Sequence, residues 1–222
     1  MSSMAQLQLM RLVSPSLPVG GFAYSQGLEY AIENAWVNNP EQLAAWISGC
    51  LNAGLACLDI PMLAALYKAC ADKDFAQFES VNLELIASRE TLELELEDVQ
   101  MGNALRTLLS QLDENITAHL SDEPMSWTSM FALAGVHWQV ELDELADGYL
   151  WTWLENQLAV AGKTLPLGQT ACQKLLSELL PLLPPAREAG LALPFNQISG
   201  SLPALSLASA LHETQYCRLF RS

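Results

Sequence analysis

Leucine dominates this sequence and limits the folds that are open to it. It fills 42 of the 222 positions, against eight valines and six isoleucines. Leucine is a strong helix former, whereas β-branched residues suit a pleated sheet. With 51% hydrophobic residues, the chain has enough apolar surface for one sizeable core. We therefore expect an all-α, single-domain bundle of roughly ten helices over residues 1–222, with Leu183–Pro203 as the only plausible seam.

Capping residues indicate where several of these helices begin. Asn39, followed by Pro40 and by Gln42 three residues after the cap, predicts a helix that runs to about Cys57. Polar caps predict three further starts: Asp59 with Pro61 in its first turn, Ser126 before Trp127–Val136, and Asp143 before a helix through Gln157. The spacing between these starts is that of helices joined by short loops.

The run Leu92–Glu97 alternates leucine with glutamate, which is the period of a strand. Both residues are nevertheless strong helix formers, and apolar residues recur there at helical spacing: Leu85, Leu92, Leu96 and Val99. We predict a helix that turns these apolar residues inward. Its glutamates Glu90, Glu93 and Glu97 would then form a solvated acidic face, with a divalent-cation site as the alternative.

The charge balance is strongly acidic, with ten lysines and arginines against 25 aspartates and glutamates and a formal charge of −15. Phosphate binding needs clustered cations, so the sequence predicts no nucleic-acid partner. An anionic membrane surface would repel the chain. The acidity would steer a basic protein partner toward it, or would serve only to keep an apolar helical protein dissolved.

The cysteines and the apolar segments bear on the compartment. The five cysteines are odd in number, form no C-x-x-C pair, and follow no signal-peptide pattern in the first ten residues. Reduced thiols in the cytoplasm fit this pattern. The apolar stretch Leu175–Leu183 is too short to cross a bilayer, so no membrane association is expected.

No motif in the sequence predicts catalysis. Gly162-Lys163-Thr164 ends like a phosphate-binding loop, but position 157 holds glutamine where that motif needs glycine. Ala23–Gly27 approaches the nucleophile elbow of a serine hydrolase, yet the prolines and glycines before it cannot form the buried strand that the elbow needs. Ser25 is better explained as the N-cap of a helix through Asn34, with a hydrolase as a minor alternative. The three histidines, His119, His137 and His212, show no ligand spacing, so we expect no catalytic residue and no cofactor.

Both ends of the chain have an unusual composition. Residues 212–222 carry Tyr216, Phe220 and two arginines, which are residue types enriched at interface hot spots. They either pack on the protein's own core or become ordered against a partner. Near the start, Ser14–Glu29 combines rigid prolines with a permissive glycine pair, which suits a structural turn or a contact surface.

These two stretches resemble the signature segments of the UreF family of urease accessory proteins, S-P-S-L-P-V-G-G-F-A-Y-S-Q-G-L-E from Ser14 and H-E-T-Q-Y-x-R-L-F-R-S from His212. Further residues resemble the internal landmarks of that family: Arg89-Glu90-Thr91, Gly102, Lys163 and Pro166–Gln169. The resemblance covers essentially the whole chain. Cys217 and Cys172 stand where the family is expected to carry small residues, which leaves the role of the thiols open.

Membership of this family would imply an all-α cytoplasmic homodimer without catalytic activity. Such proteins bind a second accessory protein, UreD or UreH, and with it recruit the GTPase UreG to apo-urease, so that nickel enters the buried site of the enzyme. The alternative is a chain that itself binds Ni²⁺ through carboxylates, histidines or Cys217.

The resemblance also implies which residues bind partners. Gly20, Gly21 and Tyr24 would help to form the shared interface, and Lys163 would lie near the face that couples to the GTPase. The last eleven residues would order against the UreD/UreH-type protein, through His212, Glu213, Thr214, Gln215, Tyr216, Arg218, Leu219, Phe220, Arg221 and Ser222. No residue is expected to be catalytic or to bind a metal.

Overall fold

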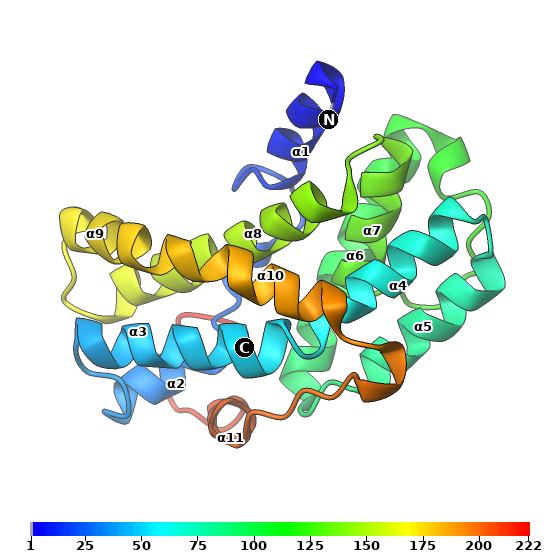
Figure 1. Cartoon of the computed structure of the whole chain (residues 1–222). Helices are drawn as coiled ribbons and strands as arrows, with labels where there is room; N and C mark the ends of the chain where they lie inside the picture. Colours follow the sequence, from blue (N-terminus) through cyan, green and yellow to red (C-terminus); the bar gives the residue numbers. More distant parts are fainter. Residues whose placement is uncertain (1) are drawn as a thin grey trace.

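The computed structural model describes residues 2–222, which form eleven α-helices and no strand, so the predicted all-α fold is confirmed. Figure 1 shows α4–α7 gathered at one end of the body and α2, α3 and α9 at the other, with α8 and α10 running between them. The helices are α1 Ser3–Leu12, α2 Leu28–Glu33, α3 Pro40–Gly49, α4 Asp59–Ala71, α5 Phe75–Ala87, α6 Leu92–Leu112, α7 Trp127–His137, α8 Leu142–Thr164, α9 Gln169–Leu179, α10 Leu183–Ala192 and α11 Pro203–His212.

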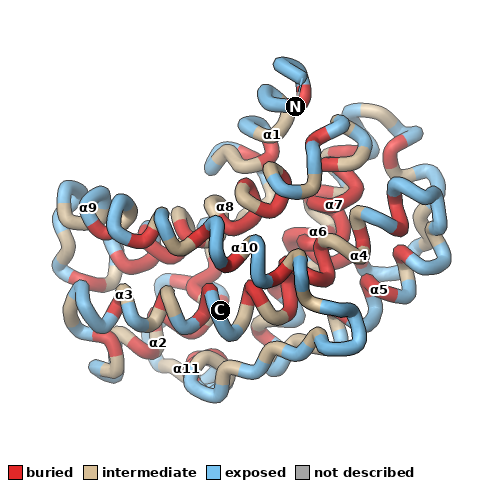
Figure 2. The backbone as a smooth tube through the Cα atoms, viewed as in Figure 1, coloured by how far each residue is buried: buried red, intermediate tan, exposed pale blue. Residues whose placement is uncertain are grey.

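Helix α7 lies at the centre of the larger end and is buried on all sides. Every residue from Trp127 to Gly135 is buried, which is the pattern expected of a helix packed on all its faces. It packs against α4 and α6, and α4 in turn packs against α5. Figure 2 shows this buried region, whereas much of α1, which projects from the body, is exposed.

Two of the predicted helix starts are confirmed by their capping bonds. The side chain of Asn39 accepts a hydrogen bond of 2.8 Å from the Gln42 backbone N–H at the start of α3. The hydroxyl of Ser126 accepts one of 3.0 Å from the Ser129 backbone N–H at the start of α7. The helix that begins at Pro40 continues after Gly49 as a π-helical turn, Cys50–Leu55, close to the predicted end.

Three predicted caps are wrong, because the helices begin at other residues. Helix α4 begins at Asp59 itself, whose carboxylate binds Arg89 instead of capping the helix. With Asp143 as its cap, helix α8 would begin at Glu144. It begins instead at Leu142, after Glu141, and it extends to Thr164. Helix α2 is preceded by Gly27 in the left-handed conformation, with φ 75°, so Ser25 is not its N-cap.

The helical interpretation of Leu92–Glu97 is confirmed, but the predicted faces are reversed. In α6 the side chains of Leu92 and Leu96 are 58% and 44% exposed, while Glu93 and Glu97 are buried. When leucine and glutamate alternate along a helix, both kinds of residue are spread around it, so opposite faces have similar polarity. Contacts with distant parts of the chain therefore decide which face turns inward.

Within the predicted seam Leu183–Pro203, helix α10 packs on the core, whereas Pro194–Gln197 is exposed. Helix α10 lies against α4 and α8, and it approaches α4 so closely that a Cβ on Gly190 would lie 2.7 Å from Ile60 side-chain atoms. A second close approach occurs at Gly102 in α6, where a Cβ would lie 2.0 Å from the Met125 main-chain oxygen. Glycine at position 102 therefore lets α6 pack directly against the segment that leads into α7.

A longer apolar segment than Leu175–Leu183 is Pro40–Ala71, which was not predicted from the sequence. It has 32 residues and contains an 18-residue window with a mean hydropathy of 1.6, so it is long and apolar enough to cross a membrane by length and composition. Within the protein, 61% of this window is buried, and the segment folds as α3, the π-helical turn and α4. A core helix passes such a test as readily as a membrane span. All five cysteines are free thiols.

Candidate functional site

Residues 213–222, here called the tail segment, dock against the loop that precedes α2. The Arg221 backbone N–H donates to the Ala23 oxygen at 2.8 Å, and the Ser25 backbone N–H donates to the Ser222 main-chain oxygen at 2.8 Å. The two sequence stretches that resemble the family signatures therefore pair with each other. Of the two interpretations of the tail, the structure shows the one in which it packs on the protein's own body.

Glu29, in the first turn of α2, binds the backbone of the tail segment. Its buried carboxylate accepts hydrogen bonds from the backbone N–H groups of Leu219 at 2.7 Å and Phe220 at 3.0 Å. The same carboxylate lies 3.0 Å from Nε2 of His212, at the end of α11. A carboxylate with several such donors makes strong, charge-assisted bonds.

Glu93, in the first turn of α6, binds one side chain at the end of α11 and one in the tail segment. Its carboxylate lies 2.8 Å from Nδ1 of His212 and 2.5 Å from Nη2 of Arg218. His212 is fully buried between the two glutamates, so its side chain links α2, α6 and α11. The tail is thus held by side chains, in addition to its backbone bonds.

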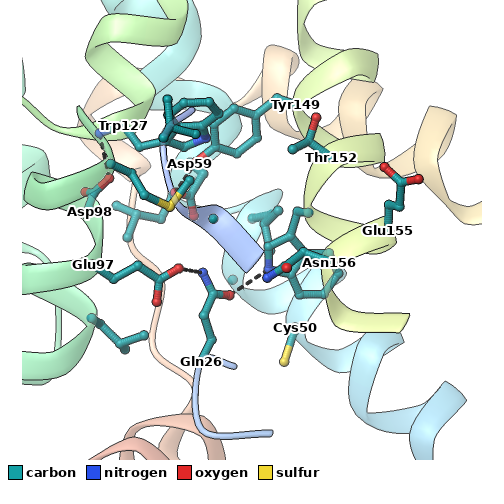
Figure 3. A pocket seen from close by; sticks show the side chains of 18 of the residues that line it. Gln26, Cys50, Asp59, Glu97, Asp98, Trp127, Tyr149, Thr152, Glu155 and Asn156 are labelled. Atoms are coloured by element: carbon teal, nitrogen blue, oxygen red, sulfur yellow. Dashed lines mark hydrogen bonds between the residues drawn. The ribbon is translucent and has the colours of Figure 1, made fainter. Parts of the chain in front are cut away.

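Glu97 lies one turn further along α6, beneath the last residue of the tail. It accepts hydrogen bonds from Nε2 of Gln26 at 2.7 Å and from the Ser222 hydroxyl at 2.8 Å (Figure 3 shows the first of these). Burial raises the pKa of Glu97 to about 7, and these two donors only partly oppose that rise. Gln26 also accepts a hydrogen bond of 2.7 Å from the indole N–H of Trp153. The backbone of Gln26 lies in the left-handed region, with a φ of 52°.

A cavity of about 310 Å³ opens beside Glu97, lined by α6, α8, the N-terminal loop and the π-helical turn (Figure 3). The charged side chains Asp59, Arg89 and Asp98 that line it are hydrogen-bonded to groups of the protein itself. Arg89 donates to Asp59 at 2.8 Å and to Asp98 at 2.9 Å, and the Tyr149 hydroxyl donates to Asp59 at 3.1 Å. Burial raises the pKa of Asp98, and the Arg89 guanidinium opposes that rise.

The residues described by the structure do not form a cluster of metal ligands at the cavity. Within residues 2–222, no group of three or more His, Cys, Asp or Glu side chains could hold a metal ion. The buried polar side-chain atoms found without a partner in this range belong to Trp46, Asp147, Gln157, Arg187 and Gln215, and none of these residues lines the cavity. The divalent-cation alternative for Glu90, Glu93 and Glu97 loses its basis, because Glu90 binds Ser201 and Ser206 while the other two face the tail.

Outside the tail segment, the predicted partner-binding residues lie in two places: Gly20, Gly21 and Tyr24 in the loop before α2, on which the tail docks, and Lys163 at the end of α8. Tyr24 is buried, and its hydroxyl donates to Gln100 at 2.7 Å. Gly20 has a φ of 79°, and Gly21 lines the cavity. Lys163 is exposed in the last turn of α8, and its Nζ lies 5.1 Å from the centroid of the Phe220 ring.

The predicted tail residues divide into anchors and exposed groups. His212, Phe220 and Ser222 are buried and can act only by positioning the segment. The remaining residues are partly or fully exposed: Glu213, Thr214, Gln215, Tyr216, Arg218, Leu219 and Arg221. Among these, Tyr216 and Leu219 present large apolar side chains to solvent.

The sequence analysis missed the carboxylates that hold the tail, namely Glu29, Glu93 and Glu97. Glu29 closes the N-terminal signature stretch, which was a signal that could have been used. The other two were misplaced on a solvated face. Gln26 and Asn156 were also missed; the Asn156 side chain donates to the Tyr24 main-chain oxygen at 3.0 Å.

Neither of the catalytic motifs considered above has the geometry that its chemistry needs. The hydroxyl of Ser25 is fully buried and donates to the Ser222 main-chain oxygen, whereas a hydrolase exposes its nucleophile. Gly162-Lys163-Thr164 lies inside the last turn of α8 and not in a loop between a strand and a helix.

Fold and site together define an all-helical protein whose C-terminal tail is held by buried carboxylates against the loop before α2. The model of the UreF family matches residues 37–180. Full-length relatives named urease accessory protein UreF include one from Hahella chejuensis, 45% identical over 222 residues and covering 100% of both chains. Another, from Marinobacter nauticus, is 48% identical over 219 residues, covering 99% of this chain and 95% of its own. A third, from Pseudomonas putida, is 46% identical over 223 residues, covering 100% and 99%. The chain belongs to the UreF family of urease accessory proteins.

Proposed function

We propose that this protein is a non-catalytic, cytoplasmic adaptor of urease maturation. It binds a UreD/UreH-type accessory protein, and with it brings a UreG-type GTPase to apo-urease for insertion of nickel. The observation that carries the proposal is the docked tail segment, which packs on the loop before α2 and leaves Tyr216 and Leu219 exposed. Membership of a family whose members are named urease accessory proteins supplies the process in which the adaptor acts.

The proposed contact surface, here called the tail face, consists of five exposed apolar residues: Leu92, Leu96, Leu211, Tyr216 and Leu219. Their side chains are 58%, 44%, 36%, 105% and 68% exposed, respectively. Helix α11 packs on α6, and Arg218 reaches Glu93, so these residues come from elements that contact one another. Exposed apolar patches with a polar rim are typical of protein interfaces, and tyrosine is enriched at hot spots.

The other partners are assigned by position. Lys163 lies at the edge of the tail segment, over Phe220, and we propose that it lies near the contact with the GTPase. The net charge of −15 favours encounter with basic partners. We further propose that the chain acts as a homodimer, as the family resemblance implies.

The tail face can be tested in the full chain with two substitutions at exposed positions. Tyr216→Ala combined with Leu219→Asp removes an aromatic anchor and places a charge on the surface. We expect the affinity for a purified UreD-type protein, measured by calorimetry, to fall by roughly tenfold or more. Leu83→Asp is the matched control, because Leu83 is 49% exposed on α5, away from the tail. Unchanged affinity in the double variant, with helicity intact, would refute the tail face as the binding surface.

A further inference from the structure

Of the three buried glutamates that hold the tail segment, Glu97 is the one that forms no ion pair among the described residues. Glu97 is 5% exposed, and Ser222 above it is 1% exposed. Its hydrogen bonds come from neutral groups, the Gln26 amide and the Ser222 hydroxyl. An ionised carboxylate in such a place has lost its hydration without gaining a counter-charge.

Within residues 2–222, no ion pair includes Glu97. Asp98, its neighbour on α6, raises the pKa of Glu97, and the Arg89 guanidinium lowers it only through space, because Arg89 binds Asp98 and Asp59. From the tail and the N-terminal loop, Arg221 and Tyr24 face the same region. The residues that contact Glu97 directly, Gln26 and Ser222, carry no side-chain charge. A second titratable group, His212, lies at the far end of the tail between Glu29 and Glu93.

We propose that Glu97 is a proton-dependent latch for the tail segment: its neutral form anchors Ser222 beneath the docked tail, and its ionised form weakens that attachment. In the neutral form the acid proton lies on Oε2 and is donated to the Ser222 hydroxyl, which then acts as acceptor. Oε1 still accepts from Gln26. No hydrogen bond is lost on protonation, and the cost of a buried charge disappears.

The direction of the pH effect follows from comparing the docked and released states. When the tail lifts, Glu97 loses its cover and returns toward the ordinary pKa of 4.5, whereas in the docked state its pKa is about 7. The docked state therefore binds the proton more tightly. The contribution of Glu97 to docking is greatest below pH 4.5 and declines as the pH rises to about 7. Each unit of that difference in pKa corresponds to about tenfold in the docking equilibrium.

The latch is a property of the isolated chain, but its consequence for partner binding rests on the proposed function. If the docked tail segment forms part of the tail face, then proton uptake at Glu97 strengthens the interaction with the UreD-type protein. The structure would thus couple the local pH to assembly of the maturation complex.

Amide hydrogen exchange in the full chain tests the latch directly. The backbone N–H groups of Leu219 and Phe220 are protected only while the tail is docked on Glu29. Protection is measured at pH 5 and pH 8, after correction for the intrinsic exchange rate at each pH. We expect a fall of roughly tenfold or more in the wild type. A wild-type tail whose corrected protection does not change with pH overturns the proposal without need of any variant.

Two substitutions on α6 assign the effect to its residue. Glu97→Gln keeps the shape and the hydrogen bonds but cannot ionise, so its protection is expected to stay high and to change less than about twofold between the two pH values. Glu95→Gln, at an exposed position of the same helix, is expected to behave as the wild type. If Glu97→Gln retains the full wild-type dependence on pH, another group such as His212 is responsible and the latch at Glu97 is wrong.

Binding of the UreD-type protein at pH 6 and pH 8 separates this proposal from the proposed function. Tighter binding at pH 6, lost in Glu97→Gln, supports both. A pH-dependent tail with partner affinity that does not change would leave the latch standing and refute the tail face as the contact surface.

Discussion

Glu97 and Asp98 are neighbours on α6, and both are buried, yet the protein surrounds them with different partners. Asp98 receives a guanidinium hydrogen bond from Arg89 and a backbone N–H from Trp127 at 2.9 Å each. Glu97 receives only the neutral donors of Gln26 and Ser222. Asp98 thus belongs to an ion-paired cluster at the centre of the fold, whereas Glu97 lies beneath a segment that can lift. The comparison shows how one turn of helix can hold both a fixed structural charge and an adjustable one.

Removing the cation from the Asp98 cluster should give the largest effect. Arg89→Met leaves Asp59 and Asp98 buried without a counter-charge, and we expect the free energy of unfolding to fall by about 3–5 kcal/mol. Urea denaturation at pH 8 measures this loss, which should shrink at pH 5 because unpaired buried carboxyls take up protons. Lys68→Met, which removes an exposed pair with Asp72, is the control and should change stability little. A loss under about 1 kcal/mol in Arg89→Met would show that the cluster contributes little to stability.

Neutralising Glu97 should have a smaller effect of opposite sign. In the wild type, the raised pKa of Glu97 makes the folded state less stable as the pH rises from 4.5 to about 7. Glu97→Gln removes that penalty, so we expect it to be about 1–2 kcal/mol more stable than the wild type at pH 8 and no different near pH 4.5. Thermal denaturation across this range compares the two chains. Destabilisation by Glu97→Gln at pH 8 would mean that the ionised form is the better anchor.

The smallest effect is expected at the edge of the tail segment. Lys163→Ala removes the cation that lies over the Phe220 ring, which should weaken tail docking by about 0.5 kcal/mol and leave global stability unchanged. Hydrogen exchange at Phe220 and urea denaturation measure the two quantities separately. Lys174→Ala, on the exposed part of α9, serves as control. A large loss of global stability in Lys163→Ala would show that Lys163 is part of the core.

Sequence reasoning predicted the elements better than the faces that they bury. The leucine excess and the caps at Asn39 and Ser126 are local signals, and local hydrogen bonds confirm them. The orientation of α6 could not be predicted in the same way, because its partners are far away in the chain. Glu93 binds His212, 119 residues on, and Glu97 binds Ser222, 125 residues on.

The resemblance to the family identified the internal landmark residues, but the sequence did not show which contacts these residues make. Arg89-Glu90-Thr91 marks the start of α6, where Arg89 pairs with α4 through Asp59 and Thr91 caps α6 while contacting Ser209 of α11 at 2.7 Å. Gly102 permits the close approach that brings α6 against the start of α7. These roles depend on pairs of elements, so a motif in a single sequence points to them but does not show what they do.

The bond between Ser25 and Ser222 joins residues that are 197 positions apart. At a synthesis rate of about 5–20 residues per second, the N-terminal loop waits roughly 10–40 s for the residue that completes its hydrogen bonds. Most of the helices in between can pack in the meantime, although α6 still lacks the contact between Glu97 and Ser222. The surface made from the two signature segments therefore forms only after both segments have been synthesised, and a ribosome-bound chain that lacks the tail cannot display it early.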